Sequence, residues 1–214
     1  MKSLSDCQLY TFIDSAYLRG RDPAGVAQQL CDGGSDLIQL RAKDYPVERI
    51  RQVAESILAV TDRAGIGLVI NDYPAIAREI GASLCHLGQE DFFDAGHAHV
   101  SELAPKDSKL QIGLSSHSPA QGARAVAAGA AYLAIGPVFA TGTKPSANPV
   151  SVKYVSWAAA NIRIPWFAIG GINLATLEAV LQAGARRICV VSAILNRDDV
   201  TQACGEFRRA LDRA

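Results

Sequence analysis

The chain repeats one pattern along its length: a short run of apolar, mainly β-branched or aromatic residues, then a longer alanine-rich stretch with helical spacing. Eight such repeats fit into 214 residues, at about 27 residues each. Runs that are apolar on both faces are typical of parallel strands covered by helices. The pattern predicts eight strands, over residues 8–13, 37–41, 68–71, 83–87, 111–114, 132–136, 166–169 and 188–191.

Eight parallel strand–helix repeats favour a (β/α)8 TIM barrel, and we predict one such domain over residues 1–214. The alternative is an open, doubly wound sheet, but no GxGxxG motif follows the first strand. Capping residues mark predicted helix boundaries, with Asp22, Ser118 and Asn173 at the starts and Gly33-Gly34, Gly129 and Gly184 at the ends.

The overall charge and composition exclude several classes of protein. The 21 basic and 21 acidic residues cancel, whereas a protein that binds duplex nucleic acid normally carries a basic excess. An apolar content of 49% is too high for a disordered chain, and no apolar run approaches the roughly 20 residues of a membrane-spanning helix. The cysteines form no CxxC pair and the N-terminus lacks an apolar signal core, so we expect a cytoplasmic protein with reduced thiols.

Polar residues follow almost every predicted strand at its C-terminal end. In a barrel of this kind the functional site lies at that end of the strands. The candidates are Gln39, Arg41, Lys43, Asn71, Asp72, His86, Asp91, Ser115, His117, Thr141, Thr143, Lys144, Gly170, Gly171 and Ser192. We therefore expect the site to be assembled from the loops that follow strands two to eight.

Alternation along the second strand places Gln39, Arg41 and Lys43 on one side of the chain. Two cations at a barrel mouth favour an anionic ligand, although a solvated strand end paired with Asp44 is an alternative of similar weight. Lys144, in the long loop after the sixth strand, would add a third cation. Three converging cations would suit a diphosphate.

Two aspartates follow neighbouring strands. Asp72 and Asp91 come after strands three and four, so both carboxylates could reach one point. Such a pair could act in general acid–base chemistry, but beside three cations we expect it to hold Mg²⁺, which would bridge the pair to a phosphate. The alternative is that each aspartate caps a helix, ahead of Pro74 and Phe92 respectively.

Glycines after the seventh strand indicate a second anion pocket. Gly170-Gly171 and Ser192 occupy the loops in which many barrels bind phosphate through backbone N–H groups. A Cβ there would block the close approach of an anion, although a purely structural turn is equally compatible with the two glycines. The histidines are less informative: His86 is expected to be a packed core residue, whereas His117 could face the site.

Together these residues resemble the thiamine-phosphate synthase family, which includes the related thiazole tautomerases. The resemblance covers nearly the whole chain, and the combination of QLRxKD, ND and GQED is the specific part of it. The matching segments are QLRAKD (39–44), IND (70–72), HLGQED (86–91), GLSSHS (113–118), GPVFATGTK (136–144), AIGGI (168–172) and VVSAI (190–194).

The resemblance implies a transferase that joins a pyrimidine methyl diphosphate to a thiazole phosphate, releasing pyrophosphate by a dissociative mechanism without a general base. The residues implied for the pyrimidine diphosphate are Gln39, Arg41, Lys43, Asn71, Ser115 and Lys144, with Arg41, Lys43, Ser115 and Lys144 as the catalytic ones. Those implied for the thiazole phosphate are Thr141, Thr143, Gly171, Val191 and Ser192, and those implied for Mg²⁺ are Asp72 and Asp91. We expect two small-molecule substrates, neither nucleic acid nor membrane as partner, and a chain that could form a homo-oligomer.

Two other functions on the same barrel are alternatives to the synthase. A thiazole tautomerase resembles this chain at residues 115–117, where a histidine is associated with proton transfer. An isomerase, however, needs no metal–diphosphate site of the kind that Lys43, Asp91 and Lys144 would form. A non-catalytic sensor of thiamine phosphate would be expected to have lost ligands, and none of those named above is missing.

The chain departs from the common family pattern at two places. Ser151-Val152 stands where relatives commonly have Gly-Leu, just after the loop that holds Lys144. Leu84-Cys85 stands before His86, where a glycine with an aliphatic residue is more usual. Neither change removes a residue implied for the site.

Overall fold

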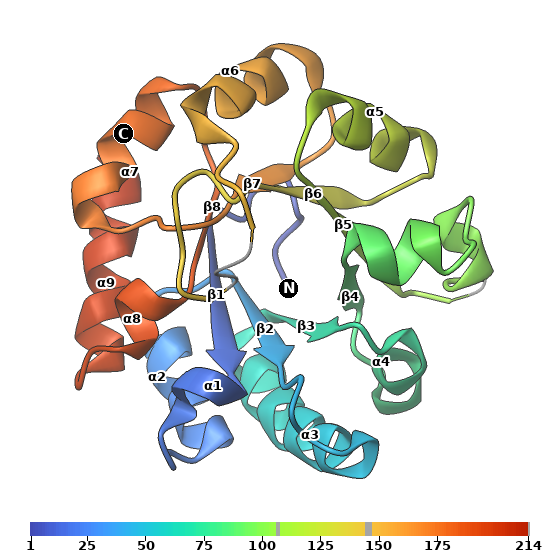
Figure 1. Cartoon of the computed structure of the whole chain (residues 1–214). Helices are drawn as coiled ribbons and strands as arrows, with labels where there is room; N and C mark the ends of the chain where they lie inside the picture. Colours follow the sequence, from blue (N-terminus) through green and yellow to red (C-terminus); the bar gives the residue numbers. More distant parts are fainter. Residues whose placement is uncertain (106–107, 144–146, 214) are drawn as a thin grey trace.

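The computed structural model of the chain describes residues 1–105, 108–143 and 147–213. Within these residues, eight parallel strands close into one barrel in sequence order, with β8 beside β1 (Figure 1). The strands are β1 (Leu9–Asp14), β2 (Leu37–Arg41), β3 (Gly67–Asn71), β4 (Leu84–Leu87), β5 (Gln111–Ser116), β6 (Tyr132–Ile135), β7 (Trp166–Ala168) and β8 (Ile188–Val190). The predicted (β/α)8 TIM barrel is confirmed, and the strand ends differ from the predicted ones by at most two residues.

Helices surround the strands and fill the connections between them (Figure 1). They are α1 (Ser15–Leu18), α2 (Pro23–Asp32), α3 (Val47–Ala64), α4 (Pro74–Ile80), the π-helical turn η1 (Glu90–Asp94), the 3-10 turn η2 (Val100–Glu102), α5 (Pro119–Ala127), α6 (Ser151–Asn161), α7 (Leu174–Gln182), α8 (Ser192–Leu195) and α9 (Val200–Leu211). None of the helices in the described ranges is both long and apolar enough to cross a membrane.

The predicted helix caps are confirmed. The side chains of Asp22, Ser118 and Asn173 accept hydrogen bonds from first-turn backbone N–H groups of α2, α5 and α7. Gly33 caps the C-terminus of α2, and Gly129 and Gly184, both with positive φ, directly follow the C-caps of α5 and α7. The helix boundaries are therefore set by local chemistry that is visible in the sequence.

Alternation along the strands separates two apolar layers. On β1, Leu9 and Ile13 point outward to the layer between strands and helices, whereas Tyr10 points into the barrel. Tyr10, Tyr132 and Phe167 form an aromatic layer across the interior, with ring centroids 5.3 to 6.0 Å apart. The barrel is thus filled below the C-terminal ends of its strands.

Gly113 on β5 makes room for this aromatic layer. A Cβ at this position would lie 2.1 Å from Cζ of Tyr132, which is closer than any side chain could tolerate. This role was not predicted from the sequence, because a glycine within a strand indicates a close neighbour without identifying it.

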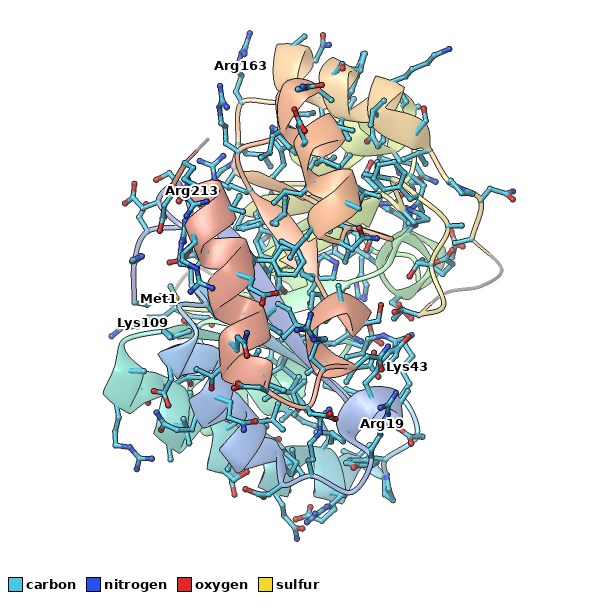
Figure 2. The ribbon with its side chains drawn as sticks, turned by 90° about the vertical axis from the view of Figure 1, so that its left-hand side faces the viewer. Met1, Arg19, Lys43, Lys109, Arg163 and Arg213 are labelled. Atoms are coloured by element: carbon cyan, nitrogen blue, oxygen red, sulfur yellow. The ribbon has the colours of Figure 1, made fainter. Side chains whose placement is uncertain are left out.

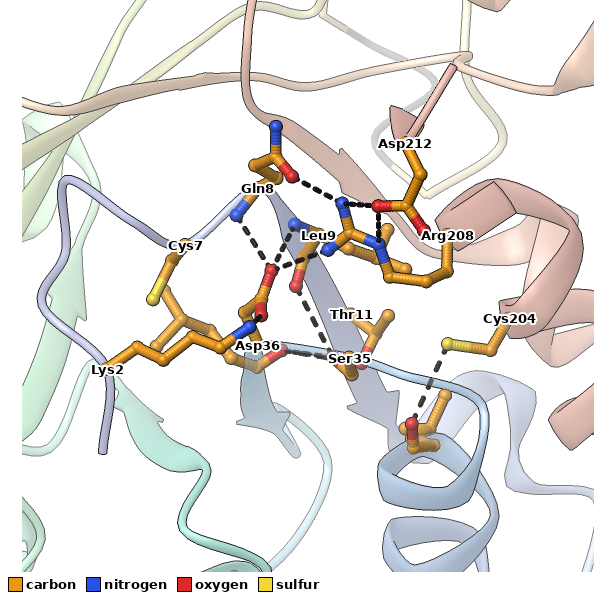
Figure 3. Close-up of polar contacts among 12 residues, drawn as sticks. Lys2, Cys7, Gln8, Leu9, Thr11, Ser35, Asp36, Cys204, Arg208 and Asp212 are labelled. Carbon is orange, nitrogen blue, oxygen red and sulfur yellow. Dashed lines mark hydrogen bonds and ion pairs between the residues drawn. The ribbon is translucent and has the colours of Figure 1, made fainter. Parts of the chain in front are cut away.

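A buried carboxylate ties together the opposite, N-terminal end of the barrel (Figure 3). Asp36, just before β2, accepts hydrogen bonds from the backbone N–H groups of Gln8 and Leu9 at 2.8 and 3.0 Å. Its two oxygens also form ion pairs with Lys2 at 2.6 Å and with Arg208 of α9 at 3.0 Å. Asp36 therefore joins the N-terminal segment, the start of β1 and the C-terminal helix.

Asp36→Asn is expected to destabilise the fold at neutral pH and to have little effect in acid. Burial raises the pKa of this carboxyl, but the hydrogen bonds from Lys2, Gln8 and Leu9 outweigh burial and hold the pKa below its usual value. Such a group stabilises the fold above its unfolded-state pKa of about 4, and the contribution is lost as the pH falls through the folded-state pKa. We expect urea unfolding to show a loss of about 2 kcal/mol at neutral pH that shrinks in acid. A loss that does not change with pH would contradict this account.

Candidate active site

One pocket opens at the C-terminal end of the barrel, above the aromatic layer. In the side view of Figure 2, Lys43 and Arg19 lie at this end of the molecule, and Met1 and Lys109 lie at the other. The lining residues are Tyr10, Phe12, Gln39, Arg41, Lys43, Asn71, Asp72, His86, Gly88, Asp91, Ser115, His117, Ala134, Gly136, Pro137, Thr141, Thr143, Ile169, Gly170, Gly171, Ile172, Cys189, Val191 and Ser192. All eight strands, or the loops that follow them, contribute to it.

The structure brings the residues predicted for the site to this single pocket. Both substrate sets implied by the resemblance, and both predicted metal ligands, are among the lining residues. Lys144 is the exception, since it lies outside the described residues. Alternation explains the placement, because Gln39, Asn71 and Ser115 occupy inward positions of β2, β3 and β5.

Arg41 and Lys43 each pair with an aspartate other than the one expected. Nη1 of Arg41 lies 2.7 Å from Oδ2 of Asp14, at the end of β1, and the side chain of Asp14 is fully buried. Nζ of Lys43 lies 3.2 Å from Oδ2 of Asp72. Asp44 instead binds a serine hydroxyl of α1. The alternative of a strand end paired with Asp44 is therefore wrong, and a buried carboxylate holds the Arg41 guanidinium at the pocket.

Asp14 was not predicted as a site residue. Its carboxylate also accepts the backbone N–H of Ala16 at 3.0 Å and so caps α1. In the sheet, Asp14 stands directly opposite Arg41. The signal was present in the sequence, because an acidic residue directly follows the first apolar run, as polar residues follow the other strands.

Asp72 and Asp91 both line the pocket, and neither caps a helix. The N-cap of α4 is Tyr73, and Asp91 lies inside the π-helical turn η1. Asp72 has a φ of 65°, in the left-handed region where aspartate is found more often than most residues. The pKa of its carboxyl is raised by burial, lowered by Lys43 and raised again by the negative charge of Asp91, with a net rise. The helix-capping alternative is wrong, and the two carboxylates act on each other.

This carboxylate pair fits a hard divalent cation. Nδ2 of Asn71 and Nζ of Lys43 both contact Oδ2 of Asp72, at 2.6 and 3.2 Å, which leaves Oδ1 for a further ligand. The described residues contain no group of three or more metal-ligating side chains. Mg²⁺ commonly uses one or two carboxylates and takes its other ligands from water and substrate phosphates, so Asp72 and Asp91 suit it.

The absence of a Cβ at Gly88 leaves room for the Asp91 carboxylate. A Cβ at Gly88 would lie 2.7 Å from Oδ2 of Asp91. Since that atom is the end of a side chain, an added methyl group would displace the carboxylate rather than the backbone. The sequence predicts no role for Gly88 beyond its place in the HLGQED segment, because spacing along the chain does not show which side chain packs against a glycine.

The glycines after β7 allow two loops to pack closely against each other. Gly170 and Gly171 have φ values of 101° and 66°, which favour glycine. A Cβ at Gly170 would lie 2.4 Å from Cβ of Pro137, and one at Gly171 would lie 2.6 Å from the carbonyl oxygen of Ala140. The absent Cβ atoms therefore let the loop after β6 pack on the loop after β7. From the sequence we predict that these glycines allow an anion to approach. In the structure they allow the two loops to pack together, which is a different reason for glycine at these positions.

The two histidines of the pocket have different surroundings. His86 is buried as predicted, and its ring nitrogens contact the Tyr132 hydroxyl at 3.2 Å and the Ser115 hydroxyl at 3.0 Å. His117 also lines the pocket, and its Nδ1 donates to the carbonyl of Gly136. Both histidines therefore belong to the candidate site.

Ser151→Gly is expected to stabilise the protein. Ser151 has a φ of 63°, a left-handed conformation that costs a non-glycine residue about 1 kcal/mol, and the resembled family commonly has glycine there. The serine Oγ recovers part of this cost by accepting the N–H of Lys153 at 3.3 Å. We expect thermal unfolding to show a midpoint about 2 °C higher. Ser151→Ala is the matched control, because it keeps the strain and loses the hydrogen bond. A glycine variant no more stable than the alanine variant would contradict this explanation.

Comparisons with known proteins identify the family of this chain. The family model for thiamine monophosphate synthase matches residues 9–194. A thiamine-phosphate synthase of Thermus thermophilus is 41% identical over 184 residues, which cover 84% of each chain. One from Halalkalibacterium halodurans is 34% identical over 211 residues, which cover 98% of each chain. Proteins with this name are transferases.

The fold has a close counterpart among solved structures. A thiamine phosphate pyrophosphorylase from Pyrococcus furiosus aligns with a TM-score of 0.86, over 99% of this chain and 98% of that one. Its sequence identity of 24% limits this likeness to the fold. The family model and the sequence relatives establish the family: the chain belongs to the thiamine monophosphate synthase family.

Proposed function

We propose that this chain is a cytoplasmic, Mg²⁺-dependent thiamine-phosphate synthase. It would transfer the (4-amino-2-methylpyrimidin-5-yl)methyl group from its diphosphate to the ring nitrogen of 4-methyl-5-(2-phosphoethyl)thiazole or its carboxylate. The products are thiamine monophosphate and pyrophosphate. The observation that carries the proposal is the meeting of Arg41, Lys43 and the Asp72–Asp91 pair in one pocket.

The charge balance of the pocket supports a metal-assisted diphosphate site. Among the described residues, the two cations Arg41 and Lys43 face three carboxylates, those of Asp14, Asp72 and Asp91. This excess of negative charge would repel a diphosphate. Mg²⁺, when bound by the aspartates, supplies positive charge that neutralises the diphosphate oxygens. The residues and the anionic substrate are thus compatible once the cation is present.

The cations are proposed to stabilise the leaving group. Arg41, oriented by the buried Asp14, and Lys43, beside Asp72, would bind diphosphate oxygens, and Lys144 would add a third cation by family resemblance. As the C–O bond breaks, its electron pair leaves with pyrophosphate, and these cations stabilise the charge that develops there. The electron-rich aminopyrimidine tolerates the cationic methylene group that remains.

The second substrate is proposed to bind along loops after β6, β7 and β8. Thr141, Thr143, Gly171, Val191 and Ser192 line that side of the same pocket. The hydroxyl of a tyrosine in α1 lies 3.1 Å from Oγ1 of Thr143 and helps to hold the loop after β6. The lone pair of the thiazole nitrogen forms the new C–N bond, and no general base is needed because that nitrogen carries no proton.

A thiazole tautomerase is the second candidate, and His117 is the observation that favours it. Because Nδ1 of His117 donates to a carbonyl, its neutral ring keeps Nε2 as the basic nitrogen, and the residue lines the pocket. Proton transfer by His117 would need neither the carboxylate pair nor the cations. The two functions therefore predict opposite rankings of the same variants.

The purified protein is expected to form thiamine monophosphate from the two phosphorylated substrates with Mg²⁺ present, and to stop when the metal is chelated. We expect Asp91→Ala to lower kcat by at least about 100-fold because a metal ligand is lost. His117→Ala is the matched variant, and its effect should be smaller. Thiazole isomerisation is assayed in parallel. Full activity with excess chelator would exclude the metal, and a larger effect of His117→Ala on isomerisation would favour the tautomerase.

Gly88→Ala is expected to weaken Mg²⁺ binding without unfolding the protein. The added Cβ displaces the Asp91 carboxylate, so the Mg²⁺ concentration for half-maximal activity should rise about 10-fold or more, as when the support of a metal ligand is lost. Gly25→Ala in α2 is the control, since its Cβ would make only an ordinary 3.4 Å contact with Asp22. An unchanged Mg²⁺ requirement in Gly88→Ala would argue against Asp91 as a ligand.

A further inference from the structure

Five side chains form an unbroken line of hydrogen bonds across the barrel interior. Nε2 of Gln39 donates to the Tyr10 hydroxyl at 2.5 Å, and this hydroxyl lies 3.1 Å from that of Tyr132. The Tyr132 hydroxyl lies 3.2 Å from Nδ1 of His86, whose Nε2 lies 3.0 Å from Oγ of Ser115. Both ends of the line, Gln39 and Ser115, line the pocket, while Tyr132 is buried in the aromatic layer.

The direction of every bond in this line follows from its first donor. An amide nitrogen can only donate, so Tyr10 accepts from Gln39. The buried Tyr10 hydroxyl then finds an acceptor for its own proton within the line only by donating to Tyr132. By the same reasoning, Tyr132 accepts from Tyr10 and donates its own proton to Nδ1 of His86, the other acceptor that it contacts in the line. In its neutral form, the imidazole of His86 then carries its proton on Nε2 and donates to Ser115. The Ser115 proton is left free for the pocket.

The line can hold one direction because its two tyrosine hydroxyls keep their protons and the main chain of Ser115 is anchored. Burial raises the pKa values of Tyr10 and Tyr132 well above their usual range, so both hydroxyls keep their protons at neutral pH. Nε2 of Gln89 donates to the backbone carbonyl of Ser115 at 2.5 Å, which anchors that residue's main chain. The hydrogen bond from His86 then restricts rotation of the Ser115 hydroxyl about the Cβ–Oγ bond.

We propose that Tyr10, Tyr132 and His86 are positioning residues that fix Ser115 as a hydrogen-bond donor toward the pocket. The ligand atom at Ser115 must therefore be an acceptor, such as a phosphate oxygen or an unprotonated ring nitrogen. The two ends of the line are coupled, since reversing the Gln39 amide would reverse every bond and turn Ser115 into an acceptor. The inference rests on the proposed function only in naming the pyrimidine diphosphate as the ligand.

Tyr132→Phe cuts the line in its middle while keeping the aromatic ring. Nδ1 of His86 then loses its donor, and the proton is no longer confined to Nε2. Nitrogen-15 NMR of the imidazole, assigned by loss of the signal in His86→Gln, should show the Nε2–H tautomer in the unaltered protein and a mixture in Tyr132→Phe. We expect the KM for the pyrimidine diphosphate to rise about 5-fold, as for a lost hydrogen bond, with the KM for the thiazole phosphate unchanged.

Tyr154→Phe is the matched control. The buried hydroxyl of Tyr154 binds Oγ of Ser116, the next residue on β5, whose side chain points away from the pocket toward the helices. This variant removes the same chemical group from a neighbouring position, so it should leave the His86 tautomer and both KM values unchanged. A second test combines Tyr132→Phe with Ser115→Ala, and we expect no KM increase beyond that of Ser115→Ala alone, because the line acts only through Ser115.

Three results would overturn the proposal: an Nδ1–H tautomer of His86 in the unaltered protein, equal KM effects of Tyr132→Phe and Tyr154→Phe, or additive effects of Tyr132→Phe and Ser115→Ala. The tautomer measurement needs no enzymatic activity. If the protein proved inactive as a synthase while His86 showed the expected tautomer and its loss in Tyr132→Phe, the proposed function would fail and the hydrogen-bonded line would stand.

Discussion

The aromatic layer of Tyr10, Tyr132 and Phe167 sets the depth at which this barrel can bind a ligand. An eight-stranded barrel has an interior only wide enough for side chains, and these three rings fill it. The inward positions beyond the rings, toward the C-terminal strand ends, include Gln39 and Ser115. The pocket therefore begins where the rings end, and its chemistry is set by the residues that follow them along the strands.

The net charge of zero says little about this pocket, because charges there are arranged as opposed pairs. Arg41 is paired with the buried Asp14, and Lys43 with Asp72, so the cations are already partly neutralised by the protein. Each pair orients a cation, but neither leaves a surplus of positive charge. A divalent ion at Asp72 and Asp91 would reverse that balance, which makes metal and diphosphate binding mutually dependent in the proposed reaction.

Sequence patterns predicted the barrel and most of the polar residues that line its pocket, because these depend on periodicity along a strand and on position just after a strand end. They did not predict the partner of Arg41, since Asp14 reaches it through the register between β1 and β2, whereas Asp44 is merely close in the chain. The roles of Gly88 and Gly113 were missed for the same reason. What a glycine makes room for, here Asp91 and Tyr132, is determined by contacts that the spacing of residues does not specify.

The hydrogen-bonded line beneath the pocket links stability to the orientation of a site residue. Two tyrosine hydroxyls inside an apolar layer would be costly to bury without partners, and the line satisfies both of them. Because each hydroxyl has one proton to donate, the Gln39 amide at the start of the line sets the direction of the bond to His86. The donor character of Ser115 thus follows from the Gln39 amide together with the need to satisfy the buried hydroxyls, and it would persist with no ligand bound. A pocket floor made of three phenylalanine-like rings would be as well packed, but it would leave Ser115 free to turn.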